Sequence, residues 1–281
     1  MPRRLIGRID VRSAGAAAVG LAMVTLVAAC GSNTSGNVAA GAATGAGGVK
    51  LVAAGKLTTC THLPYAPFQS SEGGKVVGFD IDMMDLVASK LAVTQTVVDT
   101  PFEGIKSGQD LNTGKCDVAA AGMTIKPERT KVLDFSVPYF NATQALLIKT
   151  GSGYSSLEAL KGKKLGVQSG TTGKDYITSK KLTDVAVSEF EDLATLQQAL
   201  ATNQVDAAFN DFPVWTDYIK KNPGKFAIGV EFDTGEQYGY AVKKGGSPEL
   251  LKTVDGVITA AKADGRYDAI YKKWFGTKPA S

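Results

Sequence analysis

The side chains best suited to binding chemistry gather in Ala121–Phe140, which reads AGMTIKPERTKVLDFSVPYF. An apolar run that starts at Val118 ends at Gly122, Thr124 adds a hydroxyl, and Arg129 follows five positions later. A glycine at the end of a strand lets the backbone approach a partner closely. The planar guanidinium of Arg129 matches a carboxylate with two parallel hydrogen bonds. The stretch therefore predicts a receptor for a small carboxylate, and a strand-to-helix turn with a solvated arginine is the structural alternative.

A second stretch with binding chemistry is Ser169–Gly173 (SGTTG), which follows an expected strand at Lys164–Gln168. Glycines and hydroxyls at the start of a helix present N–H groups and a partial positive charge to an anion. No Gly-Lys-Ser/Thr follows, so the loop is not a Walker A motif. Thr171 and Thr172 are the candidate anion contacts.

One acid and several aromatic residues complete the set of candidates. Asp211 ends an expected strand at Val205–Asn210 and is placed to meet a cation, or else caps the next helix. Tyr65 lies in a loop with two prolines, where no helical or strand spacing explains an aromatic. We expect Phe68 to pack in the core. Phe102 opens a helix after Pro101 and has a core role as its alternative.

The elements that position these side chains alternate between strands and helices. The alternation predicts an α/β fold with mainly parallel sheets and ligands at the carboxyl ends of the strands. Asp80 is the expected N-cap of a helix whose buried stripe contains Ile81 and Met84. We interpret Asp80, Asp82 and Asp85 as helix-capping acids and not as a catalytic pair.

The N-terminal segment, residues 1–29, has the pattern of an export signal. Four arginines precede sixteen uncharged residues, Ala14–Ala29, which is short for a membrane-spanning helix. Leu26–Cys30 (LVAAC) is similar to a bacterial lipobox, so we expect cleavage after Ala29 and lipid on Cys30. Two acyl chains suffice for stable anchoring at a membrane.

Residues 30–49 read as a flexible tether, because Gly31–Gly48 has no charge and almost no bulky side chain. Removal of the signal, with its four Arg and one Asp, would lower the formal net charge from +4 to +1. This near-neutral balance argues against nucleic acid as a partner. The remaining chain is long enough for two modest lobes.

Several motifs in order resemble one family. G-M-T-I-x-x-E-R and L-D-F-S-x-P-Y-F are followed by L-G-V-Q before S-G-T-T, by D-A-x-x-x-D, and by K-W-F-G near the C-terminus. With the earlier G-F-D-x-D, they resemble the polar amino-acid binding proteins that serve ABC importers. The resemblance covers roughly Leu57 to Gly276.

This resemblance implies a type II periplasmic-binding-protein-like fold with two hinge strands. Lobe 1 would comprise residues 50–140 and 238–276, and lobe 2 residues 141–237. It implies a monomer that binds a free amino acid and docks on an ABC-transporter permease, with no cofactor, no metal, no nucleic acid and no membrane contact except the lipid. The implied ligand contacts are Gly122, Thr124, Arg129, Thr171 and Thr172 at the carboxylate, Asp211 and the Gly122 carbonyl at the ammonium, and Tyr65 and Phe102 as opposing walls.

His62 departs from the family pattern. Many relatives have an acid three residues before the wall aromatic Tyr65, and this chain has a histidine there. The departure weakens any assignment to lysine, arginine or another cationic ligand, and it makes His62 a candidate contact.

An enzyme remains an alternative function. The same fold hosts dehydratases that act on amino-acid-like substrates, so Glu103 or His62 would be the general acid. A single histidine and the lack of an H-E-x-x-H or a paired C-x-x-C motif disfavour nucleophilic and metal-dependent catalysis.

Cys60 and Cys116 are the thiols left if Cys30 is lipidated. Export would place them in an oxidising compartment, and each precedes an expected cleft loop on neighbouring strands, so we expect a disulfide. Two buried free thiols are the alternative.

Overall fold

The computed structural model describes residues 43–44 and 46–276, which belong to the second of the two units into which the chain divides, Gly41–Ser281. The predicted signal segment, the lipid site at Cys30 and most of the predicted tether lie outside the described residues.

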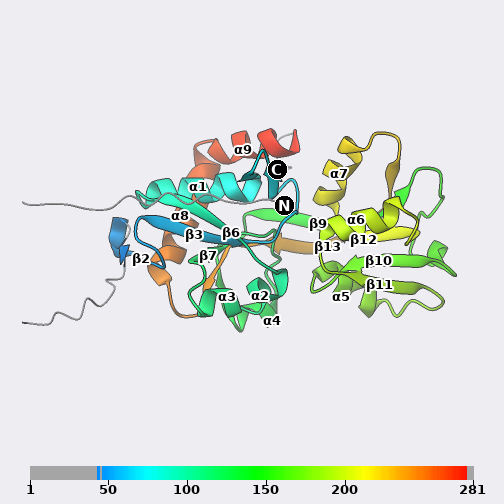
Figure 1. Ribbon diagram of the computed structural model, residues 1–281, viewed down its shortest axis with the longest axis horizontal. Coiled ribbons are helices and arrows are strands. Elements are labelled where there is room, and N and C mark those ends of the chain that lie inside the picture. Colours follow the sequence, from blue (N-terminus) through cyan, green and yellow to red (C-terminus); the bar gives the residue numbers. More distant parts are fainter. Residues whose placement is uncertain (1–42, 45, 277–281) are drawn as a thin grey trace, which may run out of the picture. The chain divides into compact units, whose positions relative to one another are not determined.

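Two five-stranded sheets organise the described residues (Figure 1). The first has the order β6-β3-β7-β14-β8. Its strands are β3 (Lys56–Thr61), β6 (Thr94–Asp99), β7 (Val118–Ala119), β8 (Leu133–Phe135) and β14 (Ala241–Lys243). The second has the order β11-β10-β12-β9-β13. Its strands are β9 (Phe140–Lys149), β10 (Lys164–Gln168), β11 (Ala186–Phe190), β12 (Ala207–Asp211) and β13 (Phe226–Tyr238). We call the residues around the first sheet lobe 1 and those around the second lobe 2.

Both sheets are mixed, but four of the five strands in each run in the same direction, so the expectation of mainly parallel sheets holds for strand direction. β3 runs parallel to β6 and β7, and β10 runs parallel to β11 and β12. β14, β9 and β13 pair antiparallel with their neighbours.

Helices cover both sheets. In lobe 1, α1 and α9 lie on one side of the sheet and α2, α3 and α4 on the other (Figure 1). The helices of lobe 1 are α1 (Phe79–Lys90), α2 (Phe102–Lys106), α3 (Gln109–Asn112), α4 (Pro127–Thr130), α8 (Pro248–Ala263) and α9 (Arg266–Phe275). Those of lobe 2 are α5 (Thr172–Ser179), α6 (Leu193–Ala201) and α7 (Phe212–Lys221), with the 3₁₀ turn η2 (Glu158–Leu160). Short elements at the periphery are β1 (Ala43–Thr44), η1 (Ala46–Gly48), β2 (Lys50–Leu51), β4 (Ser70–Glu72) and β5 (Lys75–Val77).

The central strands are buried on both faces, which is why they read as continuous apolar or small-residue runs. All five residues of β12 and five of the six residues of β3 are buried. Strands covered by helices on both sides lose the alternating pattern of a half-exposed strand. The carboxyl ends of these strands carry polar side chains, such as Thr61 of β3 and Asp211 of β12.

The chain passes between the sheets twice, at β8 to β9 and at β13 to β14. Tyr238 pairs with Phe140 where β13 and β9 meet. β13 ends at Tyr238 and β14 begins at Ala241, so residues 239 and 240 separate the two strands. Gly239 between them donates its N–H to the Met123 carbonyl, and a Cβ there would lie 2.8 Å from Ile125 Cγ1. A side chain at this position would crowd Ile125 and Phe135.

The N-cap of α1 is Gly78, so the prediction that Asp80 caps this helix is wrong. A Cβ at residue 78 would lie 2.0 Å from the Phe68 carbonyl oxygen, and its φ of +146° also favours glycine. The predicted buried stripe of the helix is confirmed, since Ile81 and Met84 are at most 5% exposed.

An aromatic cluster and a disulfide consolidate lobe 1. Phe68 is fully buried, as expected, and its ring meets those of Phe79, Phe140 and Tyr238. The predicted bond between Cys60 and Cys116 is confirmed, with Cα atoms 5.7 Å apart.

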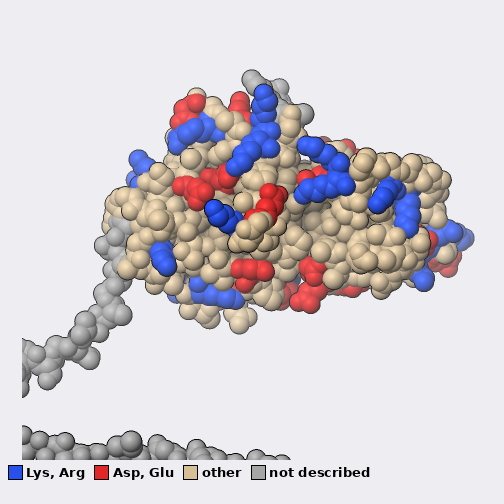
Figure 2. Space-filling model, turned by 45° about the horizontal axis from the view of Figure 1, so that its top comes forward, with Lys and Arg blue, Asp and Glu red and all other residues tan. Residues whose placement is uncertain are grey.

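On the face shown in Figure 2, basic and acidic side chains are interspersed with uncharged surface. Within the described residues, no helix combines the length and apolar character needed to cross a membrane.

Candidate functional site

A pocket lies where the loops after β3, β7, β10 and β12 meet. Loops at the carboxyl ends of strands are the common place for ligands in α/β folds. The sequence candidates among its lining residues are His62, Tyr65, Phe102, Gly122, Thr124, Arg129, Thr171, Thr172 and Asp211. Gln69, Ala121 and Gln168 complete the lining. The structure thus brings together all nine candidates, from both lobes.

Gly122 follows β7 and turns with a φ of +53°. A Cβ at this position would lie 2.9 Å from Tyr65 Cε1, so only glycine fits beneath the aromatic ring. The Gly122 N–H donates to Asp80 Oδ2 at 2.9 Å, which fixes the loop. Asp80 is therefore a buried support for the pocket floor.

Arg129 extends from the short helix α4 and is 6% exposed. Its Nη1 donates to the Thr124 carbonyl at 2.8 Å, and its Nη2 donates to the Gly170 carbonyl of lobe 2 at 3.3 Å. The guanidinium carbon lies 5.5 Å from the centre of the Phe102 ring. Burial lowers the pKa of Arg129, and the charges of Asp211 and Glu236 oppose that effect. The group stays a cation, because an arginine pKa lies far above neutral pH.

Thr171 and Thr172 occupy the start of α5, but their hydroxyls differ in role. Thr171 is the N-cap: its Oγ1 accepts the Lys174 N–H at 3.2 Å and donates to the Gln168 carbonyl at 2.8 Å. That proton is already used, so Thr171 offers a ligand its backbone more readily than its hydroxyl.

Asp211 ends β12 and starts α7 without capping it through its side chain. Tyr65 of lobe 1 donates its hydroxyl to Asp211 Oδ2 at 2.8 Å, and Tyr238 and Gln144 also donate to this carboxylate. Burial raises the pKa of Asp211 to about 7, and the negative charge of Glu236 adds to the rise. A ligand cation beside Asp211 would favour the ionised carboxylate and lower this pKa.

Glu236 binds the hydroxyls of Thr124 and Thr172, which the sequence resemblance assigns to a ligand carboxylate. Each hydroxyl donates to Glu236 Oε2 at 2.7 Å, and Gln144 Nε2 donates to Oε1 at 3.1 Å. A hydroxyl has one proton, so neither threonine can donate to Glu236 and to a ligand at once. Their assignment as carboxylate donors stays a prediction that requires these protons to turn away from Glu236.

The remaining sequence candidates on the pocket lining are His62, Tyr65 and Phe102. His62 Nδ1 lies 3.1 Å from the Thr100 carbonyl oxygen. Phe102 is the first residue of α2 and is half-buried. Tyr65 is more than an apolar wall, because its hydroxyl donates to Asp211, and the hydroxyl oxygen also lies 3.1 Å from Asn210 Oδ1.

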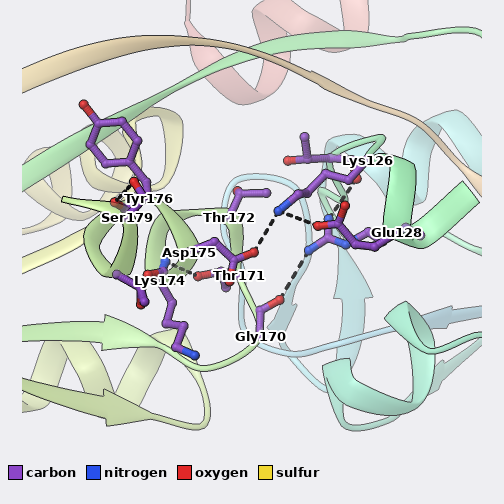
Figure 3. A network of polar contacts seen from close by, with 12 residues as sticks. Lys126, Glu128, Gly170, Thr171, Thr172, Lys174, Asp175, Tyr176 and Ser179 are labelled. Carbon is purple, nitrogen blue, oxygen red and sulfur yellow. Dashed lines mark hydrogen bonds and ion pairs between the residues drawn. The ribbon is translucent and has the colours of Figure 1, made fainter. Parts of the chain in front are cut away.

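An ion pair joins the lobes outside the pocket (Figure 3). The Nζ of Lys126, the residue before α4, lies 2.7 Å from Asp175 Oδ2 on α5 and 2.7 Å from Glu128 Oε1. The Asp175 side chain is 52% exposed, so solvent screens this pair.

Sequence reasoning missed four polar residues around the pocket: Gln69, Gln168, Gln144 and Glu236. Gln168 was identifiable in principle, since it ends β10 just before the candidate loop. Gln144 carries no such signal, because it reaches Asp211 through the antiparallel register of β9 with β12. Among the described residues, no group of three or more His, Cys, Asp or Glu side chains could hold a metal ion.

Comparisons with known proteins agree with this architecture. The ABC transporter glutamine-binding protein GlnH of Bacillus subtilis (strain 168) is 37% identical over 216 residues, which are 75% of this chain and 77% of that protein. The solved structure of an ancestral arginine-binding protein bound to arginine is 42% identical, with a TM-score of 0.74 over 79% of this chain and 99% of that one. An ancestral arginine-binding protein bound to glutamine has the same identity and TM-score, over 80% and 99% of the two chains.

These likenesses show the two-lobed periplasmic-binding architecture. The sequence model of one protein family, the bacterial extracellular solute-binding proteins, family 3, matches residues 57–277, which are more than half of the chain. The chain belongs to the bacterial extracellular solute-binding proteins, family 3.

Proposed function

We propose that this protein captures one free amino acid between its lobes and delivers it to the permease of an ABC importer. The observation that carries the proposal is a pocket whose two charged lining side chains, Arg129 and Asp211, are both buried and come from different lobes. A free amino acid carries a carboxylate and an ammonium group on one carbon. The pocket offers one buried partner of opposite charge for each.

The proposed contacts follow the chemistry of each side chain. Arg129 holds the α-carboxylate, with help from the N–H groups at the start of α5. Asp211 holds the α-ammonium, and the hydroxyl of Tyr65 keeps its carboxylate oriented. Tyr65 and Phe102 enclose the ligand from two sides. The relatives named above are amino-acid-binding proteins by their own names, which supports this class of ligand.

We retain the lobe boundaries, 50–140 with 238–276 and 141–237, as part of the proposal. We also propose that the protein works as a monomer held at the outer face of the cell membrane by lipid on Cys30. Mass spectrometry of the mature chain from a native host tests the anchor. An acyl-modified N-terminal Cys30 is the expected result, and an unmodified mature chain that starts elsewhere would refute it.

Binding explains the pocket better than catalysis does. The family match concerns solute-binding proteins, and it does not favour the dehydratase alternative. Protein incubated with a bound amino acid should therefore release it chemically unchanged, as measured by mass spectrometry.

The test of the proposal is titration calorimetry with the free amino acids on protein stripped of ligand by unfolding and refolding. At least one amino acid should bind with one site per chain. Arg129→Lys should weaken that ligand at least tenfold, about 1.4 kcal/mol, because an ammonium keeps the charge but loses the paired geometry. Arg266→Lys is the matched control, since Arg266 is exposed and pairs with Asp264. Failure of every amino acid to bind would overturn the proposal.

A further inference from the structure

Two hydrogen-bond acceptors on the pocket lining have no donor among the described residues. They are His62 Nε2 and Gln69 Oε1, and both atoms are buried. Gln69 is 1% exposed, so its oxygen cannot turn to bulk solvent. A buried acceptor without a donor costs free energy, and a ligand can supply the donor.

The Thr100 carbonyl selects the tautomer of a neutral His62 imidazole. Its Nδ1 faces the Thr100 carbonyl oxygen at 3.1 Å, and a carbonyl oxygen only accepts. Nδ1 therefore carries the proton of the neutral imidazole, which leaves Nε2 as an acceptor.

The amide of Gln69 is oriented in the same way. Its Nε2 donates to the His62 carbonyl at 3.3 Å, and the flipped amide would set two oxygens against each other. The Gln69 backbone is held by two hydrogen bonds with Tyr65, at 2.7 and 3.1 Å. The free atom of this side chain is thus the oxygen.

The charges of the lining exclude a simple salt bridge at these acceptors. Arg129 and Asp211 are the charged side chains among the lining residues, and the proposed function assigns them to the ligand's head groups. A cationic ligand side chain would lose its hydration without gaining an acid of its own. An anionic ligand side chain would place a carboxylate, which only accepts hydrogen bonds, against the two acceptors His62 Nε2 and Gln69 Oε1.

We propose that the ligand's side chain ends in a neutral carboxamide, as in glutamine or asparagine, whose NH₂ group donates to His62 Nε2 and Gln69 Oε1. A carboxamide nitrogen has two N–H donors and no charge, which matches two neutral acceptors. This inference rests on the proposed function, because it requires Arg129 and Asp211 to hold the α-groups.

A ligand panel tests the proposal on the ligand-free protein. Calorimetry would compare glutamine, asparagine, glutamate, arginine, histidine and leucine. Glutamine or asparagine should bind at least tenfold more tightly than each of the other four. Tighter binding of arginine would overturn this inference and leave the proposed function standing, whereas no binding of any amino acid would overturn both.

Two variants locate the preference at these residues. His62→Asp adds an acid, so it should weaken the carboxamide ligand and strengthen arginine, shifting their affinity ratio at least tenfold toward arginine. Gln69→Met removes an acceptor at similar volume and should weaken the carboxamide ligand at least fivefold. Gln95→Met is the matched control, because Gln95 Oε1 is also buried and without a donor among the described residues but does not line the pocket. An unchanged ratio in a folded His62→Asp protein would contradict the inference.

Discussion

Asp80 and Asp211 are two buried carboxylates whose pKa values are raised alike but whose surroundings differ. Each is at most 3% exposed, and burial raises the pKa of each from 3.8 to about 7. The partners of Asp80, the Gly122 N–H and the Tyr240 hydroxyl, are hydrogen-bonded within lobe 1. Asp211 lies in lobe 2, lines the pocket, and receives the hydroxyl of Tyr65 from lobe 1.

The comparison teaches that a perturbed pKa alone does not identify a binding residue. Desolvation raises a carboxyl pKa wherever the group is buried. The difference lies in what the acid connects. Asp80 supports a loop from behind, and Asp211 faces the pocket. Interior features of lobe 1 should therefore govern stability, and residues of the pocket should govern affinity.

Removal of the disulfide in lobe 1 should have the largest effect on stability. The bond joins residues 56 positions apart, and the chain-entropy estimate for such a loop is about 4 kcal/mol. Chemical denaturation of Cys60→Ala/Cys116→Ala should show a loss of up to this size, with ligand affinity within about threefold of the parent. If a folded double variant lost binding, the separation between stability in lobe 1 and affinity in the pocket would fail.

Asp211→Asn should weaken the amino acid at least a hundredfold, about 2.7 kcal/mol, because the α-ammonium loses its buried counter-charge. The fold should persist, since Asn removes a buried charge and keeps an acceptor for Tyr65. Asp80→Asn is the control, with affinity within about threefold. Calorimetry on both variants compares their ligand affinities. An equal loss of affinity in both would show that burial of the carboxylate, and not its place on the pocket lining, determines binding.

The pH dependence of stability should report Asp80 with a definite sign. Its pKa is higher in the folded chain, so the folded state holds this proton more tightly than the unfolded state. The stabilising contribution is complete below about pH 4 and lost as the pH rises to about 7. Relative to Asp80→Asn, the parent should therefore lose at least about 1 kcal/mol of unfolding free energy between pH 4 and pH 8. Denaturation curves with a constant difference across this range would argue against the buried carboxyl.

Lys126→Ala should have the smallest effect, because its ion pair with Asp175 joins the lobes at an exposed position. Such pairs contribute about 0–1 kcal/mol. Affinity should change less than about threefold. The control is Lys174→Ala, whose partner Glu189 lies in the same lobe. If Lys126→Ala alone lowered ligand affinity tenfold, the exposed ion pair, and not the buried pocket residues, would hold the lobes together.

Local patterns made part of the structure predictable from the sequence. Gly122, Thr124 and Arg129 follow one strand closely, and Asp211 ends another, so the common edge of the strands brings them together. The strands and amphipathic helices also carried enough pattern to indicate the α/β class. Such inferences need only short-range spacing and the rule that ligands bind at strand ends.

The rest depended on pairings that the sequence does not display. Gln144 reaches Asp211 through strand register, and Glu236 lies on β13, where it accepts a hydrogen bond from Gln144 of β9. Gly78 replaced Asp80 as the N-cap because the Phe68 carbonyl passes too close for a side chain. Each of these requires tertiary contacts, which local propensity does not encode.

The central claim is that one amino acid is held by both lobes at once. Cysteines introduced at Val132 of lobe 1 and Val187 of lobe 2, which are 37% and 46% exposed, can carry spin labels for a distance measurement. A saturating amino acid, shown by calorimetry to bind, should shift the interlobe distances to a shorter, narrower distribution. Asp211→Asn should prevent most of that shift at the same ligand concentration. An identical distance distribution with and without bound ligand would contradict the account.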